Sequence, residues 1–235
     1  MRLRVATYNV RKCVGLDWRR DPDRVLAVIN MLDADIVVLQ EADRRFGRRI
    51  ATLSHSSLRD SGWYAVPLAP HDGGIGWHGN AVLVRNDMEA EAIHRVKLPA
   101  LEPRGAVIVD LATASGPIRV VGAHLGLTRG MRVRQAHQIV EEVGAMAARP
   151  TVIMGDLNTW HQTGGSIAVL AGAYALVPPA PTFHASRPVA ALDRIALSHD
   201  IALRAQGVMR EGVAPVASDH LPLWADIEVV KGESR

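Results

Sequence analysis

The chain of 235 residues has few cysteines, lysines and aromatic side chains, and each shortage narrows what the protein can be. A single cysteine, Cys13, excludes an internal disulfide and suits a reducing compartment. Aromatic residues make up only 4% of the chain, which leaves few platforms for stacking single-stranded bases. The apolar runs are far shorter than the roughly 20 residues of a membrane-spanning helix, and the N-terminus lacks the apolar region of a signal peptide. We therefore expect a cytoplasmic protein without a membrane segment.

The rest of the composition is that of an ordinary folded protein. Hydrophobic residues make up 48% and charged residues 22%, which excludes disorder, collagen-like repeats and coiled coils. The length fits one domain over residues 1–235, which we expect to be a monomer. Arginine outnumbers lysine by 24 to 3, as on a phosphate-binding surface, although a coding bias toward arginine explains this equally well. The net charge of +3 is too small to require a nucleic-acid partner. The densest basic cluster is Arg44, Arg45, Arg48 and Arg49.

Short apolar runs alternate with helical patterns along the chain. Asp21 and Pro22 form the N-cap and first position of an expected helix, and two more helices are expected at Arg44–Leu53 and Met131–Ala148. Helices between strands indicate an α/β or α+β protein whose sheets are covered by helices, in two loosely similar halves. The expected strands are Leu3–Tyr8, Ile36–Leu39, Ala81–Val84, Val107–Leu111, Ile118–Ala123, Thr151–Met154, Leu192–Leu197, Ile201–Met209 and Leu223–Val229.

Polar residues stand at the ends of several of these apolar strands. Each has a structural explanation when taken alone, such as an Asx-turn at Asp156 or a hydrogen-bonded core histidine at His124. Their joint occurrence is harder to explain by turn chemistry, because ligand sites in α/β proteins gather where loops leave the ends of strands. The residues are Asn9, Glu41, His124, Asp156, Asn158, Asp193, Asp219 and His220.

These residue types suit one kind of chemistry. Hard oxygen ligands favour Mg²⁺ or Mn²⁺, whereas a zinc site would need cysteines or closely spaced histidines. The two histidines could donate to phosphate oxygens or move protons, and Asp193 could orient His220. The oxygen donors are Glu41, Asp156, Asp219, Asn9 and Asn158.

Seven segments carry a recognisable order of motifs from residue 5 to about residue 228. They are Thr7–Arg11 (TYNVR), Leu39–Glu41 (LQE), Gly79–Arg85 (GNAVLVR), Gly122–Leu127 (GAHLGL), Gly155–Asn158 (GDLN), Leu192–Ile195 (LDRI) and Ser218–Pro222 (SDHLP). Together they resemble the endonuclease/exonuclease/phosphatase superfamily, in particular its deoxyribonuclease I-like bacterial members. The superfamily also includes exonuclease III-type abasic endonucleases, bacterial sphingomyelinases and inositol polyphosphate 5-phosphatases.

The resemblance implies a fold and a metal site. The fold is a four-layer α-β-β-α sandwich of two packed mixed β-sheets, with the active site at one edge of the sheets. The residue that matches Glu41 binds the metal in such enzymes, helped by those that match Asn9 and Asp219.

The resemblance also implies catalytic roles. Asp156 positions or deprotonates the attacking water, and Asn158 holds the phosphate. Asp193 and His220 act as a dyad, and His124 matches a phosphate-binding histidine. The implied reaction is in-line attack of water on phosphorus, which a metal ion assists.

Two departures from the family pattern narrow the substrate. Arg11 stands where abasic endonucleases carry an acidic residue, which lowers that possibility. The central segment GWHGNAVL contains His78 and Asn80 but no acid, so the partner of His124 is in doubt. We expect Arg11, Asn80 and Arg104 to bind substrate.

Three functions remain open, and the first is weakly favoured. A nuclease acting on DNA or RNA would use a basic groove and lose activity with added salt. A sphingomyelinase-like phosphodiesterase, acting on a phospholipid or another small diester, would need an apolar patch beside the site. A non-catalytic binding module on the same fold is disfavoured because every expected catalytic position is filled. The candidates for this apolar patch are Ile75, Trp77, Leu125, Leu127 and Trp160. Four tryptophans are expected in or near site loops, where each could equally be a packing residue at the rim: Trp18, Trp63, Trp77 and Trp160.

Overall fold

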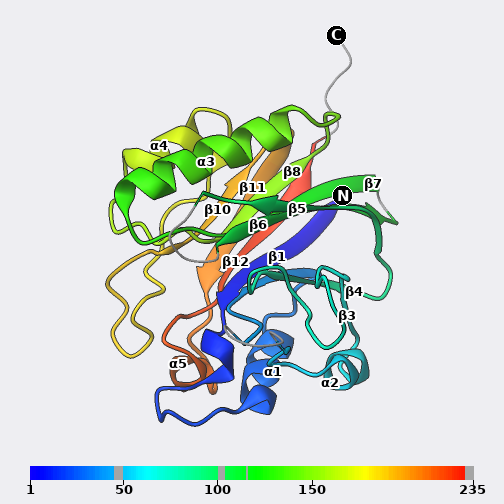
Figure 1. The fold of residues 1–235 in the computed structure, drawn as a ribbon, viewed down its shortest axis with the longest axis vertical. Coiled ribbons are helices and arrows are strands. Elements are labelled where there is room, and N and C mark those ends of the chain that lie inside the picture. The colour runs from blue at the N-terminus through cyan, green and yellow to red at the C-terminus, as the bar shows by residue number, and fades with distance from the viewer. Residues whose placement is uncertain (45–49, 100–103, 115, 231–235) are drawn as a thin grey trace.

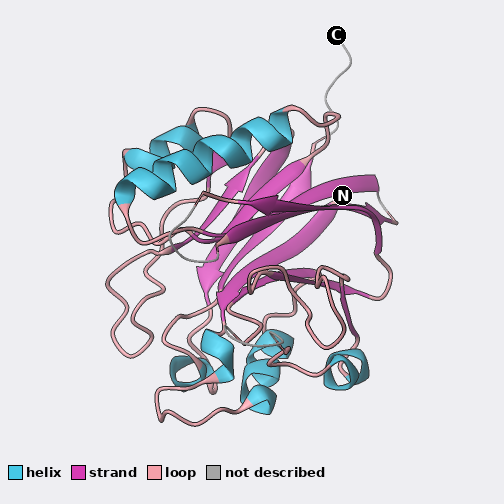
Figure 2. Ribbon diagram, viewed as in Figure 1, coloured by secondary structure: helices cyan, strands magenta, loops and turns pink. Residues whose placement is uncertain are grey.

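Two six-stranded sheets pack face to face in the computed structural model, which describes residues 1–44, 50–99, 104–114 and 116–230 (Figures 1 and 2). The first sheet has the order β11-β12-β1-β2-β4-β3 and the second has the order β5-β6-β7-β8-β10-β9. The strands of the first sheet are β1 (Arg2–Asn9), β2 (Ile36–Gln40), β3 (Trp63–Ala65), β4 (Ala81–Arg85), β11 (Ile201–Val208) and β12 (Leu223–Val229). Those of the second sheet are β5 (Glu89–Lys97), β6 (Gly105–Thr113), β7 (Gly116–His124), β8 (Thr151–Asp156), β9 (Ala175–Leu176) and β10 (Asp193–Leu197).

Helices cover the outer face of each sheet, so that the molecule has four layers (Figure 1). On the first sheet lie α1 (Pro22–Met31), α2 (His55–Asp60) and α5 (Ala214–Ala217), and on the second lie α3 (Arg129–Gly144) and α4 (Gly165–Ala171). A third apolar cluster fills the space between the sheets. The expected α-β-β-α sandwich of two mixed sheets is therefore confirmed.

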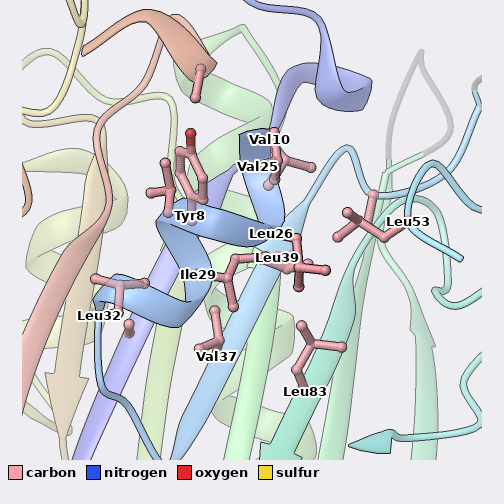
Figure 3. Packing of buried hydrophobic residues seen from close by; sticks show 14 of the residues in the cluster. Tyr8, Val10, Val25, Leu26, Ile29, Leu32, Val37, Leu39, Leu53 and Leu83 are labelled. Atoms are coloured by element: carbon pink, nitrogen blue, oxygen red, sulfur yellow. The ribbon is translucent and has the colours of Figure 1, made fainter. Parts of the chain in front are cut away.

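The alternation of side chains along β2 explains how one strand serves two apolar layers. Ile36 and Val38 belong to the cluster between the sheets, whereas Val37 and Leu39 face α1. Figure 3 shows the apolar layer between the first sheet and its helices, in which Ile29 of α1 packs toward the sheet. Burying a side chain of this size contributes roughly 1.5–3 kcal/mol, so β2 is stabilised from both faces, as its uninterrupted apolar sequence indicates.

Each sheet contains one parallel pair, and both pairs end at the edge where the candidate site lies. β1 runs parallel to β2 and β7 runs parallel to β8. Parallel neighbours need a crossover connection, which α1 and α3 provide. The Asp21 side chain accepts a hydrogen bond from the Arg24 amide and Pro22 begins α1, as the sequence predicts.

Some expected elements differ from those observed. The described ends of Arg44–Leu53 are not helical, because Asp43 and Ala51 form a β-bridge there, and residues 45–49 lie outside the described residues. That range also holds Arg45, Arg48 and Arg49 of the basic cluster. The helix expected to reach Ala148 ends at Gly144, a poor helix former, beyond the last side chain that it buries, Val143.

Several short or amphipathic elements carry no clear pattern in the sequence. β5 is an edge strand with polar and exposed residues, and β3, β9, α2, α4 and α5 are short. No helix among the described residues combines the length and apolarity that crossing a membrane requires.

Candidate active site

Asp156, the last residue of β8, is the centre of the site. Its Oδ2 atom lies 3.0 Å from Asn9 Nδ2, 3.3 Å from His124 Nε2 and 3.8 Å from His220 Nε2, and the residue is 2% exposed. Burial alone would raise the pKa of Asp156, but His124 and His220 together hold it well below its usual range. Asp156 is therefore a buried, ionised carboxylate on which both sheets converge.

Strand register brings these groups together. His124 and Asp156 are paired residues at the ends of β7 and β8, while Asn9 ends β1 opposite Gln40 of β2. The hydrogen bond from Asn9 Nδ2 to Asp156 Oδ2 joins the first sheet to the second. Equivalent ends of the two sheets thus meet at one carboxylate.

Asp193 and His220 form a buried pair beside Asp156. His220 Nδ1 lies 2.8 Å from Asp193 Oδ2, which also accepts a 2.6 Å hydrogen bond from Thr182. Burial lowers the pKa of His220, but the Asp193 carboxylate outweighs it and raises the pKa to about 10. Burial also raises the pKa of Asp193. This contact fixes the imidazole with Nδ1 on Asp193 and Nε2 on the side of Asp156.

His124 has two polar neighbours, which answers the question of its partner. Its Nε2 atom contacts Asp156, and the Nη1 atom of Arg104 lies 2.6 Å from Nε2 and 2.8 Å from Nδ1. Arg104 directly precedes β6, whose first residues pair with the end of β7. The expected substrate-binding arginine is therefore placed against the expected phosphate-binding histidine.

Glu41 follows β2, and its carboxylate contacts a lysine that sequence reasoning missed. Lys12 donates from Nζ to Glu41 Oε2, and the Lys12 amide donates to the Glu41 carbonyl at 3.1 Å. Burial raises the pKa of Glu41, but the positive charges of His124 and Lys12 lower it by more than burial raises it. The pKa of Glu41 is therefore lower than its usual value. Lys12 comes only three residues after Asn9, but no sequence motif signals that it turns back toward Glu41.

Left-handed backbone explains how these side chains reach the site. Arg11, Lys12 and Cys13 have φ values of 45°, 58° and 59°, and Glu41 and Asn158 have φ values of 54° and 50°. Residues other than glycine rarely adopt such angles, and clusters of them are typical of functional sites. Each of these residues turns the chain sharply just after a strand. The sequence does not predict these turns, because none of the residues is a glycine.

Two further expected residues contact each other at the rim. Arg11 Nε lies 3.4 Å from Asp219 Oδ2, and both side chains are about one fifth exposed. The Arg11 guanidinium also lies 4.6 Å from the ring centroid of Trp18. Ser218 donates to the Asn9 carbonyl and so ties the Asp219 loop to the end of β1.

The two expected asparagines differ in their placement. The Asn158 amide donates to Asp156 Oδ1 at 2.9 Å, and its side chain donates to the Leu125 carbonyl, which joins the loops after β7 and β8. Asn80 is fully buried, and its side-chain nitrogen donates to the carbonyls of Gly105 and Trp77. Asn158 belongs to the network around Asp156, whereas Asn80 lies beneath it.

The expected aromatic and apolar residues divide into core and surface. Trp63 is fully buried and donates to Asn30, so its expected place in a site loop is wrong. Ile75 and Leu125 are also core residues and supply no surface patch. Trp160 and Leu127 are 61% and 63% exposed on the loops after β8 and β7.

The donors fit a hard cation held largely by water and substrate oxygens. No group of three or more histidine, cysteine, aspartate or glutamate side chains in the described ranges is arranged to enclose a metal. Magnesium needs only one or two protein carboxylates, and the ionised Glu41 supplies one, with Asn9 and Asp219 near the same edge. A site of this kind agrees with the oxygen-rich donor set, and a zinc cage does not.

A model of the "Endonuclease/Exonuclease/phosphatase family" matches residues 6–220. The chain belongs to this family. Members of the family are generally phosphoester hydrolases and typically use divalent metal ions.

Three similar proteins illustrate how far the likeness extends. The chain is 32% identical over 164 residues to the uncharacterized protein YbhP of Escherichia coli K12, a match over 66% of this chain and 64% of that protein. A Beutenbergia cavernae endonuclease/exonuclease/phosphatase structure is similar with a TM-score of 0.76 and 23% identity, over 97% of this chain and 72% of that one. D. rerio TDP2, complexed with single-strand DNA product, has a TM-score of 0.74 and 14% identity, over 97% and 99%. At these identities the two solved structures establish the fold alone.

Proposed function

We propose that the chain is a Mg²⁺-dependent phosphodiester hydrolase in which Asp156 activates the attacking water. The observation that carries this proposal is a buried, ionised carboxylate in contact with Asn9 and two histidines. Burial of a charge is unfavourable unless it is paired, and buried carboxylates with strongly shifted pKa values are concentrated at functional sites, which supports a catalytic role for Asp156.

Asp156 acts mainly by orientation. Its low pKa keeps it ionised near neutral pH, so it accepts a hydrogen bond from water and aims the lone pair at phosphorus. The same low pKa makes it a weak final acceptor for the proton. Asn158, whose amide fixes Asp156 Oδ1, lies beside the position expected for the phosphate.

His220 supplies positive charge to the reacting phosphate. Because Asp193 raises its pKa to about 10, the imidazole is protonated at neutral pH and Nε2 can donate. A donor fixed in a buried site stabilises charge that develops on the phosphate oxygens without further reorganisation. His124 and Arg104 provide further donors at the second sheet.

Glu41, with Asn9 and Asp219, would hold the metal ion. When bound, Mg²⁺ or Mn²⁺ supplies Lewis-acid stabilisation of charge on the phosphoryl and leaving-group oxygens. Lys12 and Arg11 bring permanent positive charge to the same carboxylates and so set how strongly a cation is held.

A nucleic acid is the favoured substrate, with Arg11 and Arg104 as candidate contacts, whereas the buried Asn80 would act only through the Gly105 carbonyl that it holds. Arg11 and Arg104 border the site from opposite sheets, which suits a strand of phosphates that passes between them. A phospholipid or small diester is the second candidate, which the exposed Trp18, Leu127 and Trp160 support. These three exposed side chains lie on loops that follow β1, β7 and β8.

A hydrolysis assay with Mg²⁺ or Mn²⁺ against EDTA tests the proposal. The substrates are plasmid DNA, single-stranded DNA, RNA, sphingomyelin, a phosphatidylinositol lipid and a chromogenic phosphodiester. Metal-dependent cleavage of nucleic acid that falls with added salt supports the nuclease, and cleavage confined to lipid or small diesters supports the second candidate. A mock preparation from cells that lack the protein controls for contaminating hydrolases, and inactivity on every substrate without metal binding would support a binding module.

A further inference from the structure

A pocket of about 130 Å³ lies between the start of α3 and the loop that leads into α4. Its walls include Arg129, Arg132, Thr159, His161, Gly165 and Ser166, and no acidic side chain lines it among the described residues. Thr159 directly follows Asn158, so the pocket is reached along the loop that leaves the catalytic strand β8. It is built from residues that the proposed catalytic mechanism does not use.

The two arginines give the pocket a positive charge that no carboxylate on its described walls neutralises. Arg132 is buried, and its guanidinium donates to the carbonyls of Gly126 and Leu127 rather than to an acid. Burial and the nearby Arg129 both lower the pKa of Arg132. Arg129 leans over the other wall, since a Cβ atom at Gly165 would lie 3.7 Å from Arg129 Nε.

Polar groups around the pocket lack partners. Ser166 is 2% exposed and lines the pocket, and its hydroxyl has no hydrogen-bond partner among the described residues. Arg194 does not line the pocket, but it donates weakly to the His161 carbonyl, at 3.5 Å, and its buried Nε atom is also unpartnered within the described chain. Buried polar atoms are nearly always hydrogen-bonded in native proteins, so an unsatisfied hydroxyl beside two arginines indicates a missing anionic ligand.

We propose that this pocket is a phosphate subsite, which holds a phosphate group of the substrate next to the one that is cleaved. The inference rests on the proposed function, because it extends the same site along the loops after β7 and β8. The volume suits one phosphate group, and guanidinium and hydroxyl donors match its oxygens. The substrate would therefore carry at least two phosphates, on a nucleic-acid strand or on a small polyphosphorylated molecule.

A binding measurement tests the subsite without reference to catalysis. Inorganic phosphate is titrated by calorimetry in EDTA into the full chain, Arg129→Gln and Arg134→Gln. Arg134 is the matched control, because it lies on the same helix but is exposed and outside the pocket. Arg129→Gln should weaken phosphate binding by about tenfold, the usual cost of a charge-assisted hydrogen bond, and Arg134→Gln should not. Ser166→Ala, a small change, should weaken it several-fold with an unchanged Tm.

A kinetic comparison distinguishes the sources of the phosphate. The substrates are a chromogenic diester with one phosphate, a 5′-phosphorylated dinucleotide, and an oligonucleotide without terminal phosphates. Arg129→Gln should lower the preference for a two-phosphate substrate over the chromogenic diester by about tenfold, mainly through KM. A loss confined to the dinucleotide indicates a terminal phosphate, and a loss confined to the oligonucleotide indicates an internal one.

Two results would distinguish failure of the phosphate subsite from failure of the proposed function. Equal phosphate binding and equal substrate preference for Arg129→Gln and Arg134→Gln would overturn the subsite even if hydrolysis is intact. Arg129-dependent phosphate binding by a chain that hydrolyses nothing would support the anion subsite while overturning the proposed function.

Discussion

The two sheets repeat one framework but contribute different chemistry to the edge where they meet. In each sheet the central parallel pair, β1-β2 or β7-β8, is flanked by antiparallel neighbours in the same sequence of directions. Asn9 ends β1 as His124 ends β7, and Glu41 follows β2 where Asp156 ends β8. The first sheet thus offers an amide and a carboxylate paired with lysine. The second offers a carboxylate, Asp156, that contacts its neighbour His124 and also His220 from the loop before β12.

The same framework carries a matched pair of salt bridges five residues before these strand ends. Arg4 of β1 binds Asp226 of β12 through two nitrogens, and Arg119 of β7 binds Asp110 of β6 in the same way. The first pair is about one third exposed, with side-chain exposures of 32% and 34%, whereas the second is buried at 2% and 9%. The two Arg–Asp pairs therefore have the same residue types and the same hydrogen bonds but differ in solvent access. A comparison of their contributions to stability shows the effect of burial alone.

The largest expected effect is on the carboxylate of the second sheet. Asp156→Asn keeps the shape but removes the charge that orients water, so kcat should fall by about 10³-fold. Steady-state kinetics with purified protein, and circular dichroism for the fold, measure this. Near-wild-type turnover would show that Asp156 is not the catalytic carboxylate. The second sheet would then not supply the group that activates water.

The matched salt bridges give the next largest effect. Asp110→Asn leaves Arg119 charged and buried and should cost about 3 kcal/mol of the free energy of unfolding. Asp226→Asn leaves Arg4 able to reach water and should cost less than about 1 kcal/mol. Urea unfolding of the two variants measures the difference, and equal losses would contradict the role assigned to burial.

The dyad that joins the two sheets, Asp193 of β10 and His220 just before β12, is expected to matter nearly as much for rate. Asp193→Asn removes the strongest of the charges that raise the pKa of His220 to about 10, so that pKa should fall, with only Asp156 and Asp219 left to oppose the effect of burial. A smaller fraction of the imidazole would be protonated at pH 8, so kcat should fall by up to about 10²-fold there and less at low pH. A pH–rate profile with an unchanged alkaline limb would refute the coupling of Asp193 to His220.

The sequence predicts the strand ends well because a strand that is buried on both sides tolerates only apolar residues, and a polar residue after it is conspicuous. Asn9, His124 and Asp156 are predicted in this way, and Asp193 is predicted because it interrupts an apolar run; the structure links the first three by direct contacts and pairs Asp193 with His220. Their catalytic roles stay predictions. Trp63 was misplaced because an aromatic residue in a polar context looks exposed, whereas it packs under α1 and bonds Asn30.

Contacts set by loop geometry could not be predicted. The left-handed turn Arg11–Cys13 carries Lys12 back to Glu41, and residues that adopt positive φ for functional reasons have no clear sequence signature. The Arg119–Asp110 pair depends on the β6-β7 register, and the pocket at Arg129 depends on how α3 lies against α4. In each case the partner is distant in sequence or fixed by a loop, so local patterns contain no information on it.

The smallest effect tests the first sheet, where Glu41 and Lys12 should change metal dependence in opposite directions. Glu41→Gln removes a ligand charge and should raise the Mg²⁺ concentration for half-maximal activity by about tenfold. Lys12→Met removes a competing positive charge beside that carboxylate and should lower it by several-fold, since two charges about 4 Å apart interact by about 1 kcal/mol in water. Magnesium titrations of both variants provide the measurement. If the two curves shift in the same direction, Lys12 serves to position Glu41 rather than to compete with the cation, and the first sheet then resembles the second, where a basic side chain supports the carboxylate.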